Sequence, residues 1–254
     1  MKTPVSVGLI GSQFISTIHA ESLLACSQAR LAAVASPTPG NAARFAGRFG
    51  IPQACTDYRD LLAMPDIQMV VVGVPNDLHC QVVLDAAAAG KHVVIEKPLC
   101  LNLAEADRMI EACRLAGVKL MYAEELCFAP KYVLGGMDGR AEVHGSGGVA
   151  YADLLHGNAI ETYSSGGYEY AVEKAGSTRG WSFTIYEEAW NHGFHHEMAH
   201  FVDCVQNDKT PLVTGEDARV VLEVLFAAYE SARLGQKVEF PFHTTASRPI
   251  DLWR

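Results

Sequence analysis

The sequence predicts an α/β protein, with a parallel sheet in its first half and a smaller α+β domain, built on an antiparallel sheet, in its second. Short apolar runs alternate with helix-compatible segments as far as residue 122. The run 69–74 is apolar at nearly every position, as in a strand that is covered on both faces. Such alternation favours right-handed crossovers between parallel strands. The alternation stops after residue 123, so we expect domains at 1–123 and 124–254.

The first half contains five apolar runs that we interpret as strands, at 5–10, 31–35, 69–74, 92–95 and 118–122. Helices are expected between them, at 14–26, 41–49, 81–89 and 102–117. Asn41 is a candidate N-cap for the second helix, and Gly90 is a C-terminal cap for the third. Asn102 with Glu105 three residues later is typical of a capping box.

The second half has a different texture. Six glycines between residues 135 and 148 predict a loop, and alternating runs predict antiparallel strands at 149–153, 168–172 and 181–186. Helices are expected at about 194–206 and 216–234. We interpret residues 124–254 as a smaller α+β domain.

The composition excludes several classes of partner. The net charge of −9 argues against nucleic acid and against anionic membranes, because both would repel an acidic surface. The seven cysteines form no C-x-x-C pair, which is typical of reduced thiols in a cytosol. No apolar stretch approaches the ~20 residues that span a bilayer, and the first apolar run is too short for a signal peptide. We therefore expect a cytoplasmic chain.

A turn with the sequence Gly11-Ser12-Gln13-Phe14-Ile15 joins the first strand to the first helix. Backbone N–H groups at a helix N-terminus favour an anion, and dinucleotide-binding (Rossmann-type) domains place the pyrophosphate there. Of the G-x-G-x-x-G pattern this turn keeps the first glycine, while Gln13 and Ser16 replace the others. The second strand is followed by Ser36, where NAD-preferring enzymes have a carboxylate. We therefore expect NAD or NADP as cofactor, with NADP tolerated or preferred.

Two further motifs close neighbouring strands. Pro75-Asn76-Asp77-Leu78-His79 follows the third apolar strand, and Glu96-Lys97-Pro98-Leu99 follows the fourth. Open parallel sheets bind ligands at these carboxyl ends. A lysine there can steady negative charge on a carbonyl or alkoxide oxygen, or take part in proton transfer. Lys97 is therefore the candidate catalytic residue.

Together, the glycine turn and these two motifs resemble the Gfo/Idh/MocA oxidoreductases, the group of glucose–fructose oxidoreductase and inositol dehydrogenase. The resemblance implies a hydride transfer between NAD(P) and a carbinol carbon of a sugar, cyclitol or related polyol. It implies that residues 11–15 cradle the pyrophosphate and that Pro75, Asn76 and His79 border the cofactor. Glu96 and Lys97 would lie by the nicotinamide, with Lys97 touching the substrate's reacting oxygen. It also implies a homo-oligomer formed through the C-terminal sheet.

The sequence departs from this family after residue 133. Members normally carry much more chain there, with an Asp-x-x-x-His motif whose histidine exchanges the substrate's proton. The nearest candidate, Asp153-Leu154-Leu155-His156, is one residue too short. The chain therefore resembles a member that lacks an internal segment, and we expect nucleotide binding with little or no turnover. The alternative is a non-catalytic nucleotide-binding or assembly protein of the same fold.

One motif points to different chemistry. His196-Glu197-Met198-Ala199-His200 is an H-E-x-x-H sequence on a predicted helix, which could grip zinc and make the chain a metallopeptidase. A third ligand is needed, and Glu216 or Glu223 qualifies only by lying downstream. This helix also lies where the family has one that packs on the dinucleotide domain. We therefore expect no metal site.

Overall fold

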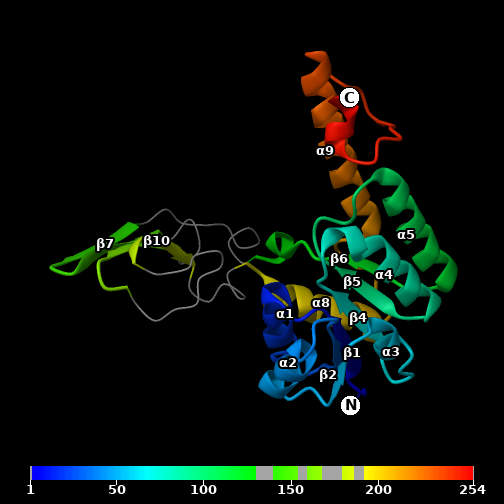
Figure 1. The fold of residues 1–254 in the computed structure, drawn as a ribbon, viewed down its shortest axis with the longest axis horizontal. Helices are drawn as coiled ribbons and strands as arrows, with labels where there is room; N and C mark the ends of the chain where they lie inside the picture. The colour runs from blue at the N-terminus through cyan, green and yellow to red at the C-terminus, as the bar shows by residue number, and fades with distance from the viewer. Residues whose placement is uncertain (1, 130–139, 154–158, 168–178, 186–191, 254) are drawn as a thin grey trace. The chain divides into compact units, whose positions relative to one another are not determined.

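The computed structural model describes residues 2–129, 140–153, 159–167, 179–185 and 192–253 (Figure 1). These residues form two compact units: Met1–Glu124 with Met198–Arg254, and Glu125–Glu197. The first unit is built on a parallel sheet and the second on an antiparallel one, so the predicted fold class is confirmed.

The parallel sheet of the first unit has six strands in the order β3-β2-β1-β4-β5-β6. Their bounds are β1 Val5–Ile10, β2 Ala29–Ala35, β3 Gln53–Cys55, β4 Met69–Val72, β5 His92–Ile95 and β6 Leu120–Tyr122. All neighbouring pairs run parallel, and every residue of β1 and β4 is buried. The chain moves outward in one direction from β1 and in the other from β4. Their carboxyl ends therefore form the switch point where such sheets bind ligands.

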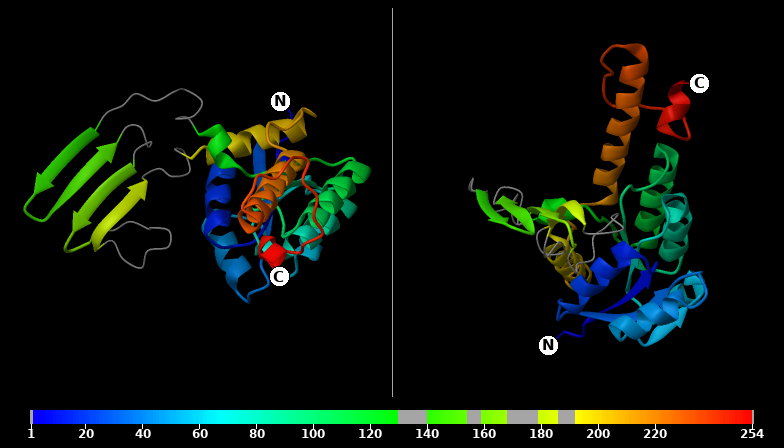
Figure 2. Two further views of the ribbon diagram at one scale, coloured as in Figure 1. Left: turned by 90° about the horizontal axis from the view of Figure 1, so that it is seen from above. Right: turned by 60° about the vertical axis from the view of Figure 1, so that its left-hand side comes forward.

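Helices cover both faces of this sheet. Their bounds are α1 Phe14–Leu24, α2 Asn41–Phe49, α3 Tyr58–Leu62, α4 Asn76–Ala88 and α5 Leu103–Ala116. Because right-handed crossovers that move in opposite directions place their helices on opposite faces, α1 and α2 cover one face and α4 and α5 the other (Figures 1 and 2). The helix cap at Asn102 is confirmed, because its Oδ1 accepts the Glu105 N–H at 2.9 Å.

Three local predictions for this unit were wrong. Gly40, with φ 78°, occupies the N-cap of α2, so Asn41 is already the first helical residue. Helix α4 begins at Asn76, five residues before the predicted start, with Pro75 as N-cap. The short elements β3 and α3 were missed, because three to five residues are too few to show a period.

Two further helices, α8 Phe194–Gln206 and α9 Gly215–Leu234, lie close to the predicted ranges. The first unit contains α8 from Met198 onward and all of α9. Thr214 and Asp217 form a reciprocal capping box at the start of α9. This helix packs on α5 and β6, and Arg219 Nε lies 2.5 Å from Asp107 Oδ1 on α5. A short 3-10 helix at Pro249–Trp253 packs on α9 in turn.

The second unit contains an antiparallel sheet in the order β10-β9-β8-β7. Its strands are β7 Arg140–Gly145, β8 Gly148–Asp153, β9 Ala159–Ser164 and β10 Gly180–Ile185. The glycine-rich stretch predicted as a loop is thus a strand over residues 140–145, and β9 was missed. A Cβ at Gly148 would come within 2.1 Å of the Tyr163 carbonyl oxygen, so this glycine allows β8 to approach β9. The strand predicted at 168–172 lies outside the described residues.

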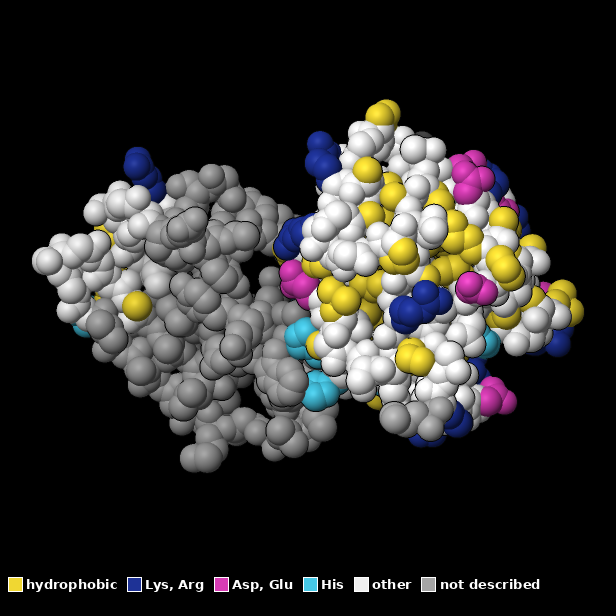
Figure 3. Space-filling view, turned by 90° about the horizontal axis from the view of Figure 1, so that it is seen from below, with side chains coloured by type: hydrophobic (Ala, Val, Ile, Leu, Met, Phe, Trp, Pro, Cys, Tyr) yellow, Lys and Arg dark blue, Asp and Glu magenta, His cyan; other side chains and the backbone are white. Residues whose placement is uncertain are grey.

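The described surface carries mixed charge. On the face drawn in Figure 3, lysine and arginine side chains lie singly between acidic and hydrophobic ones. Among the described residues, no helix has both the length and the hydropathy needed to cross a bilayer.

Candidate nucleotide-binding site

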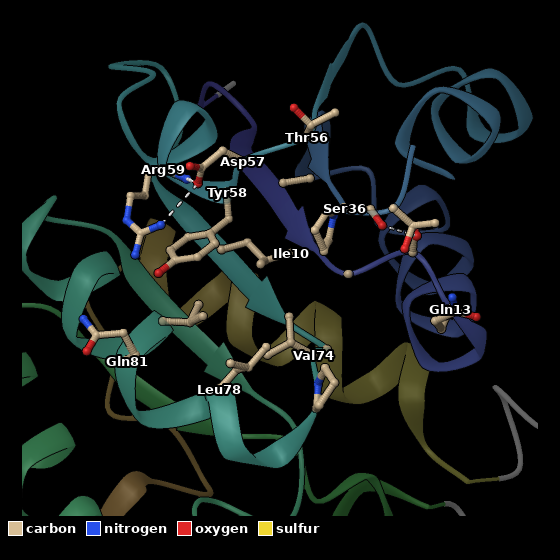
Figure 4. Close-up of a pocket in the computed structure, with 18 residues that line it drawn as sticks. Ile10, Gln13, Ser36, Thr56, Asp57, Tyr58, Arg59, Val74, Leu78 and Gln81 are labelled. Carbon is tan, nitrogen blue, oxygen red and sulfur yellow. Dashed lines mark hydrogen bonds and ion pairs between the residues drawn. The ribbon is translucent and has the colours of Figure 1, made fainter. Parts of the chain in front are cut away.

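A cavity of about 600 Å³ lies over the carboxyl ends of the parallel strands (Figure 4). Its wall is formed by the glycine turn after β1, the ends of β2 and β4, the start of α3 and the first turns of α4. Ile10, Val74, Leu78 and Val82 make part of the wall apolar. The volume falls in the range of ~300–1,000 Å³ that is usual for small-molecule sites.

Gly11 sits at the switch point in a conformation that favours glycine. Its φ is 123°, and its N–H donates to the Ala35 carbonyl at 2.9 Å. A Cβ at this position would meet the Gly73 carbonyl oxygen at 2.3 Å. Residue 11 must therefore be glycine for the turn to keep this conformation, and the absence of a side chain lets a ligand approach the backbone.

The N-terminus of α1 opens beside this glycine. Gln13 is its N-cap, no side chain of the described chain caps it, and its first turn contains no acidic residue. Ser16, at the third position of the glycine pattern, is buried with its Oγ within 3.0 Å of the Cβ that Gly11 lacks. A serine is thus small enough for the close packing of helix and strand, which explains why that glycine is dispensable here.

Ser36, directly after β2, faces the same turn. Its hydroxyl accepts a hydrogen bond of 2.9 Å from Ser12 Oγ, and both residues line the cavity (Figure 4). The position where a carboxylate would hold ribose hydroxyls therefore carries a neutral hydroxyl pair.

The wall opposite Ser36 was missed by sequence reasoning. Asp85 on α4 accepts hydrogen bonds from the Tyr58 hydroxyl at 2.6 Å and from Gln81 Nε2 at 2.7 Å. Arg59 lies 3.4 Å from the same carboxylate and stacks over the Tyr58 ring. Burial and the bond to Asp85 raise the pKa of Tyr58 to about 12, so the phenol stays protonated. Asp57, which caps α3, was the available sequence signal for this segment.

Of the residues that follow β4, some line the cavity and others are buried in the core. Pro75 lines the cavity, whereas His79 is 1% exposed. The His79 ring nitrogens lie against backbone carbonyls, with Nδ1 3.0 Å from Pro98 O and Nε2 2.9 Å from Val74 O. His79 therefore ties the segment after β4 to the turn after β5. Asn76 Oδ1 is buried without a hydrogen-bond partner among the described residues.

Glu96 and Lys97 form the turn after β5. His19 on α1 is fully buried, and its Nε2 lies 2.6 Å from Glu96 Oε1. Glu96 Oε2 accepts the Lys97 N–H at 3.1 Å. The Lys97 side chain is 38% exposed, and its Nζ lies 4.0 Å from Glu124 Oε1. His19 and Glu124 are contacts that the sequence motifs did not reveal, because they join segments distant along the chain.

The predicted site residues thus fall into two groups. The cavity wall brings together Gly11, Ser12, Gln13, Ser36 and Pro75. Phe14, Ile15, Asn76, His79, Glu96 and Lys97 are outside that wall. Of this second group, Phe14 is 42% exposed on the first turn of α1. Glu96 and Lys97 follow β5, two strands from β1 in the same sheet, or about 10 Å away.

The candidates for other chemistry have different surroundings. His156 lies outside the described residues. In the H-E-x-x-H sequence, His200 Nε2 accepts the Leu212 N–H at 2.9 Å, and Glu197 is fully buried. Among the described residues, no group of three or more histidine, cysteine or acidic side chains is arranged to hold a metal ion.

The residues over the strand tips fit a nicotinamide dinucleotide. The space at Gly11 that a Cβ would fill and the uncapped α1 N-terminus suit a pyrophosphate. The apolar part of the cavity suits a base. The fit rests on backbone geometry as much as on side chains.

Comparisons with known proteins agree with this geometry. Residues 5–124 match the model of an oxidoreductase family with an NAD-binding Rossmann fold, and residues 120–240 match the model of its C-terminal alpha/beta domain. A myo-inositol 2-dehydrogenase from Thermotoga maritima is 38% identical over 45% of this chain and 34% of its own length. A levoglucosan dehydrogenase from Pseudarthrobacter phenanthrenivorans is 33% identical over 54% of the chain and 38% of its own. The matches thus span little more than a third of these relatives.

Solved structures show the same fold. The crystal structure of GenD2 from gentamicin A biosynthesis, in complex with NAD, has a TM-score of 0.77 and 23% identity, and the match covers 95% of this chain and 98% of that one. A levoglucosan dehydrogenase in complex with NADH has a TM-score of 0.66 and 16% identity, covering 95% and 100%. Identities this low support the fold alone, whereas the two family models together span residues 5–240. The chain belongs to the Gfo/Idh/MocA oxidoreductase family.

Proposed function

We propose that this chain binds a nicotinamide dinucleotide, NAD or NADP, across its strand tips and is built for hydride transfer with a sugar, cyclitol or related polyol. The observation that carries the proposal is the Gly11 turn, with φ 123° and an uncapped helix behind it, in the same sheet as the Lys97 turn. The family supports the substrate class, and so do the inositol and levoglucosan dehydrogenases among the relatives.

Each protein group has a distinct task in this proposal. The backbone around Gly11 and the α1 N-terminus hold the pyrophosphate, and the apolar cavity holds the adenosine. The bound nicotinamide supplies the hydride acceptor or donor. The Lys97 ammonium donates a hydrogen bond to the substrate's reacting oxygen and stabilises the negative charge that develops there. Glu124 Oε1 lies 4.0 Å from Lys97 Nζ, so a negative charge faces this ammonium. Among the described residues, Glu124 is the carboxylate nearest to the ammonium and therefore the candidate acceptor of its proton.

Turnover is expected to be weak. General acid–base assistance is worth ~10²–10⁴ in rate, and the Asp-x-x-x-His motif that provides it in the family is absent from the sequence. His156 is the remaining candidate. If it is the proton carrier, His156→Ala abolishes turnover and leaves cofactor binding intact.

A fluorescence titration with NADH and NADPH, followed by a panel of polyols that includes myo-inositol and levoglucosan, tests the proposal. We expect saturable binding of at least one dinucleotide, its loss in Gly11→Ala, and its retention in Lys97→Met. If the wild-type chain binds neither dinucleotide, the proposal is wrong. Binding without turnover on any polyol would favour the alternative, a non-catalytic nucleotide-binding or assembly protein.

We also propose a homo-oligomer formed through the antiparallel sheet. Tyr163 and Trp181 are paired across β9 and β10 with their ring centroids 5.6 Å apart, yet they are 43% and 54% exposed. An exposed aromatic pair of this kind favours a sheet face that is covered by a second copy. Light scattering after gel filtration should give a dimer or larger, and Trp181→Glu should reduce it to a monomer.

The seven cysteines, none in a disulfide, favour a cytoplasmic location.

A further inference from the structure

A second hollow, of about 330 Å³, opens between the N-terminus of α1 and the helix α2. Ser12 and Gln13 line both this hollow and the larger cavity, so the two spaces meet at the glycine turn. The proposed binding of a dinucleotide uses the larger cavity and assigns nothing to the smaller one. The rest of the smaller hollow's wall consists of Thr17, Asn41, Arg44, Phe45 and Arg48.

This wall carries positive charge without a carboxylate. Arg44 and Arg48 lie one turn apart on the same face of α2. The Arg44 guanidinium donates a hydrogen bond to the Asn41 side chain, which is a neutral partner. Arg48 lies 3.4 Å from Glu21 and stacks over the Phe49 ring. Arg44 is therefore the guanidinium whose described contacts leave its charge uncompensated.

The junction between the two spaces is polar and uncharged. There the hydroxyls of Ser12 and Ser36 lie 2.9 Å apart, and Thr38 adds a third hydroxyl to the wall of the larger cavity. A ribose seated against Ser36 would thus place its 2′ substituent beside these hydroxyls. Ser12 and Gln13, which line both spaces, connect this position to the hollow that Arg44 lines. A carboxylate at position 36 would repel an anionic 2′ substituent, whereas the neutral serine hydroxyl does not.

We propose that the smaller hollow is a subsite for a phosphate monoester on the 2′ oxygen of the dinucleotide, with Arg44 as its main ligand, so that the chain prefers NADP(H) to NAD(H). The inference rests on the proposed dinucleotide site. It assigns to that site a specificity residue which lies on α2, eight residues beyond Ser36. A planar guanidinium suits a phosphate because it donates two parallel hydrogen bonds in addition to its charge.

Binding measurements with the full chain test this inference without needing turnover. NADPH, NADH, 2′,5′-ADP, 5′-ADP and inorganic phosphate would be titrated against the wild type, Arg44→Gln, Arg44→Lys and Arg114→Gln. Arg114 is exposed on α5 and paired with Glu111, so its variant removes one charge away from both cavities. We expect the wild type to bind NADPH at least tenfold more tightly than NADH, and 2′,5′-ADP more tightly than 5′-ADP.

The variants give the sharper result. Arg44→Gln should weaken NADPH binding about tenfold or more, because a charge-assisted bond is lost, while NADH binding changes less than about twofold. Arg44→Lys should retain part of the preference, and Arg114→Gln all of it. Equal loss of both dinucleotides in Arg44→Gln, or NADH binding as tight as that of NADPH in the wild type, overturns the inference and leaves the proposed function standing. Inorganic phosphate that binds as well as 2′,5′-ADP would show a free-anion site and also overturn it. If neither dinucleotide binds, the proposed function itself fails.

Discussion

The buried contact between His19 and Glu96, next to the Lys97 turn, allows the stability loss of a His19 variant to be predicted. The His19 side chain is fully buried, the Glu96 side chain is 8% exposed, and the two lie 2.6 Å apart. The substitution His19→Leu would leave a buried carboxylate with the Lys97 N–H, 3.1 Å away, as its remaining described partner. Removing one partner of a buried pair typically costs about 3–5 kcal/mol, so we expect the free energy of unfolding to fall by that amount.

Urea denaturation followed by circular dichroism at 222 nm measures this change, and two variants control it. His19→Leu with Glu96→Met removes both polar partners and should recover most of the lost stability, because replacing both partners of a buried hydrogen bond by apolar groups can be nearly neutral. Arg114→Ala breaks an exposed pair with Glu111 and should have no measurable effect. A loss below ~1 kcal/mol in His19→Leu, or a double variant as unstable as the single one, would show that the pair does not stabilise the fold in this way.

Three further predictions concern single residues. Gly11→Ala should lower stability by about 1–3 kcal/mol and abolish dinucleotide binding, because φ is 123° and the new Cβ would meet a carbonyl oxygen; thermal unfolding and an NADPH titration check both. Burial lowers the pKa of His200 from 6.5, and its neutral ring accepts the Leu212 N–H. The free energy of unfolding should therefore fall by about 1 kcal/mol as the pH drops below 6.5, because the unfolded chain takes up this proton more readily. His200→Gln should flatten that acid loss, and an unchanged pH dependence would contradict this. Burial raises the pKa of Cys100 to about 12, so Ellman's reagent at pH 8 should modify the exposed Cys127 rapidly and Cys100 only on unfolding; equal rates would contradict the packing.

The sequence predicted the parallel sheet because its signals are local. Fully buried strands such as β4 appear as continuous apolar runs, and the intervening helices end at glycines that adopt a left-handed conformation. Gly90, with φ 70°, and Gly117, with φ 67°, were found in this way. The glycine turn and the two strand-end motifs were local signals as well, so one wall of the candidate site was accessible from the sequence.

The rest of the site depends on contacts between segments far apart in the chain. Asp85 meets Tyr58 across 27 residues, and His19 meets Glu96 across 77. No periodicity in the sequence signals such pairs. His79 carried a recognisable motif, but its burial against backbone carbonyls followed only from the fold. Strand β7 was missed because its many glycine neighbours favour a loop when the partner strand is unknown.

We infer that the strand tips hold a nicotinamide dinucleotide with its reactive ring beside Lys97. A crystal structure of the chain grown with NADPH tests this placement. We predict density for the pyrophosphate against the Gly11 turn, for the adenosine in the cavity bounded by Ser36 and Tyr58, and for the nicotinamide next to the Lys97 ammonium. Density for the dinucleotide elsewhere on the chain, or a nicotinamide turned away from Lys97, would contradict this placement.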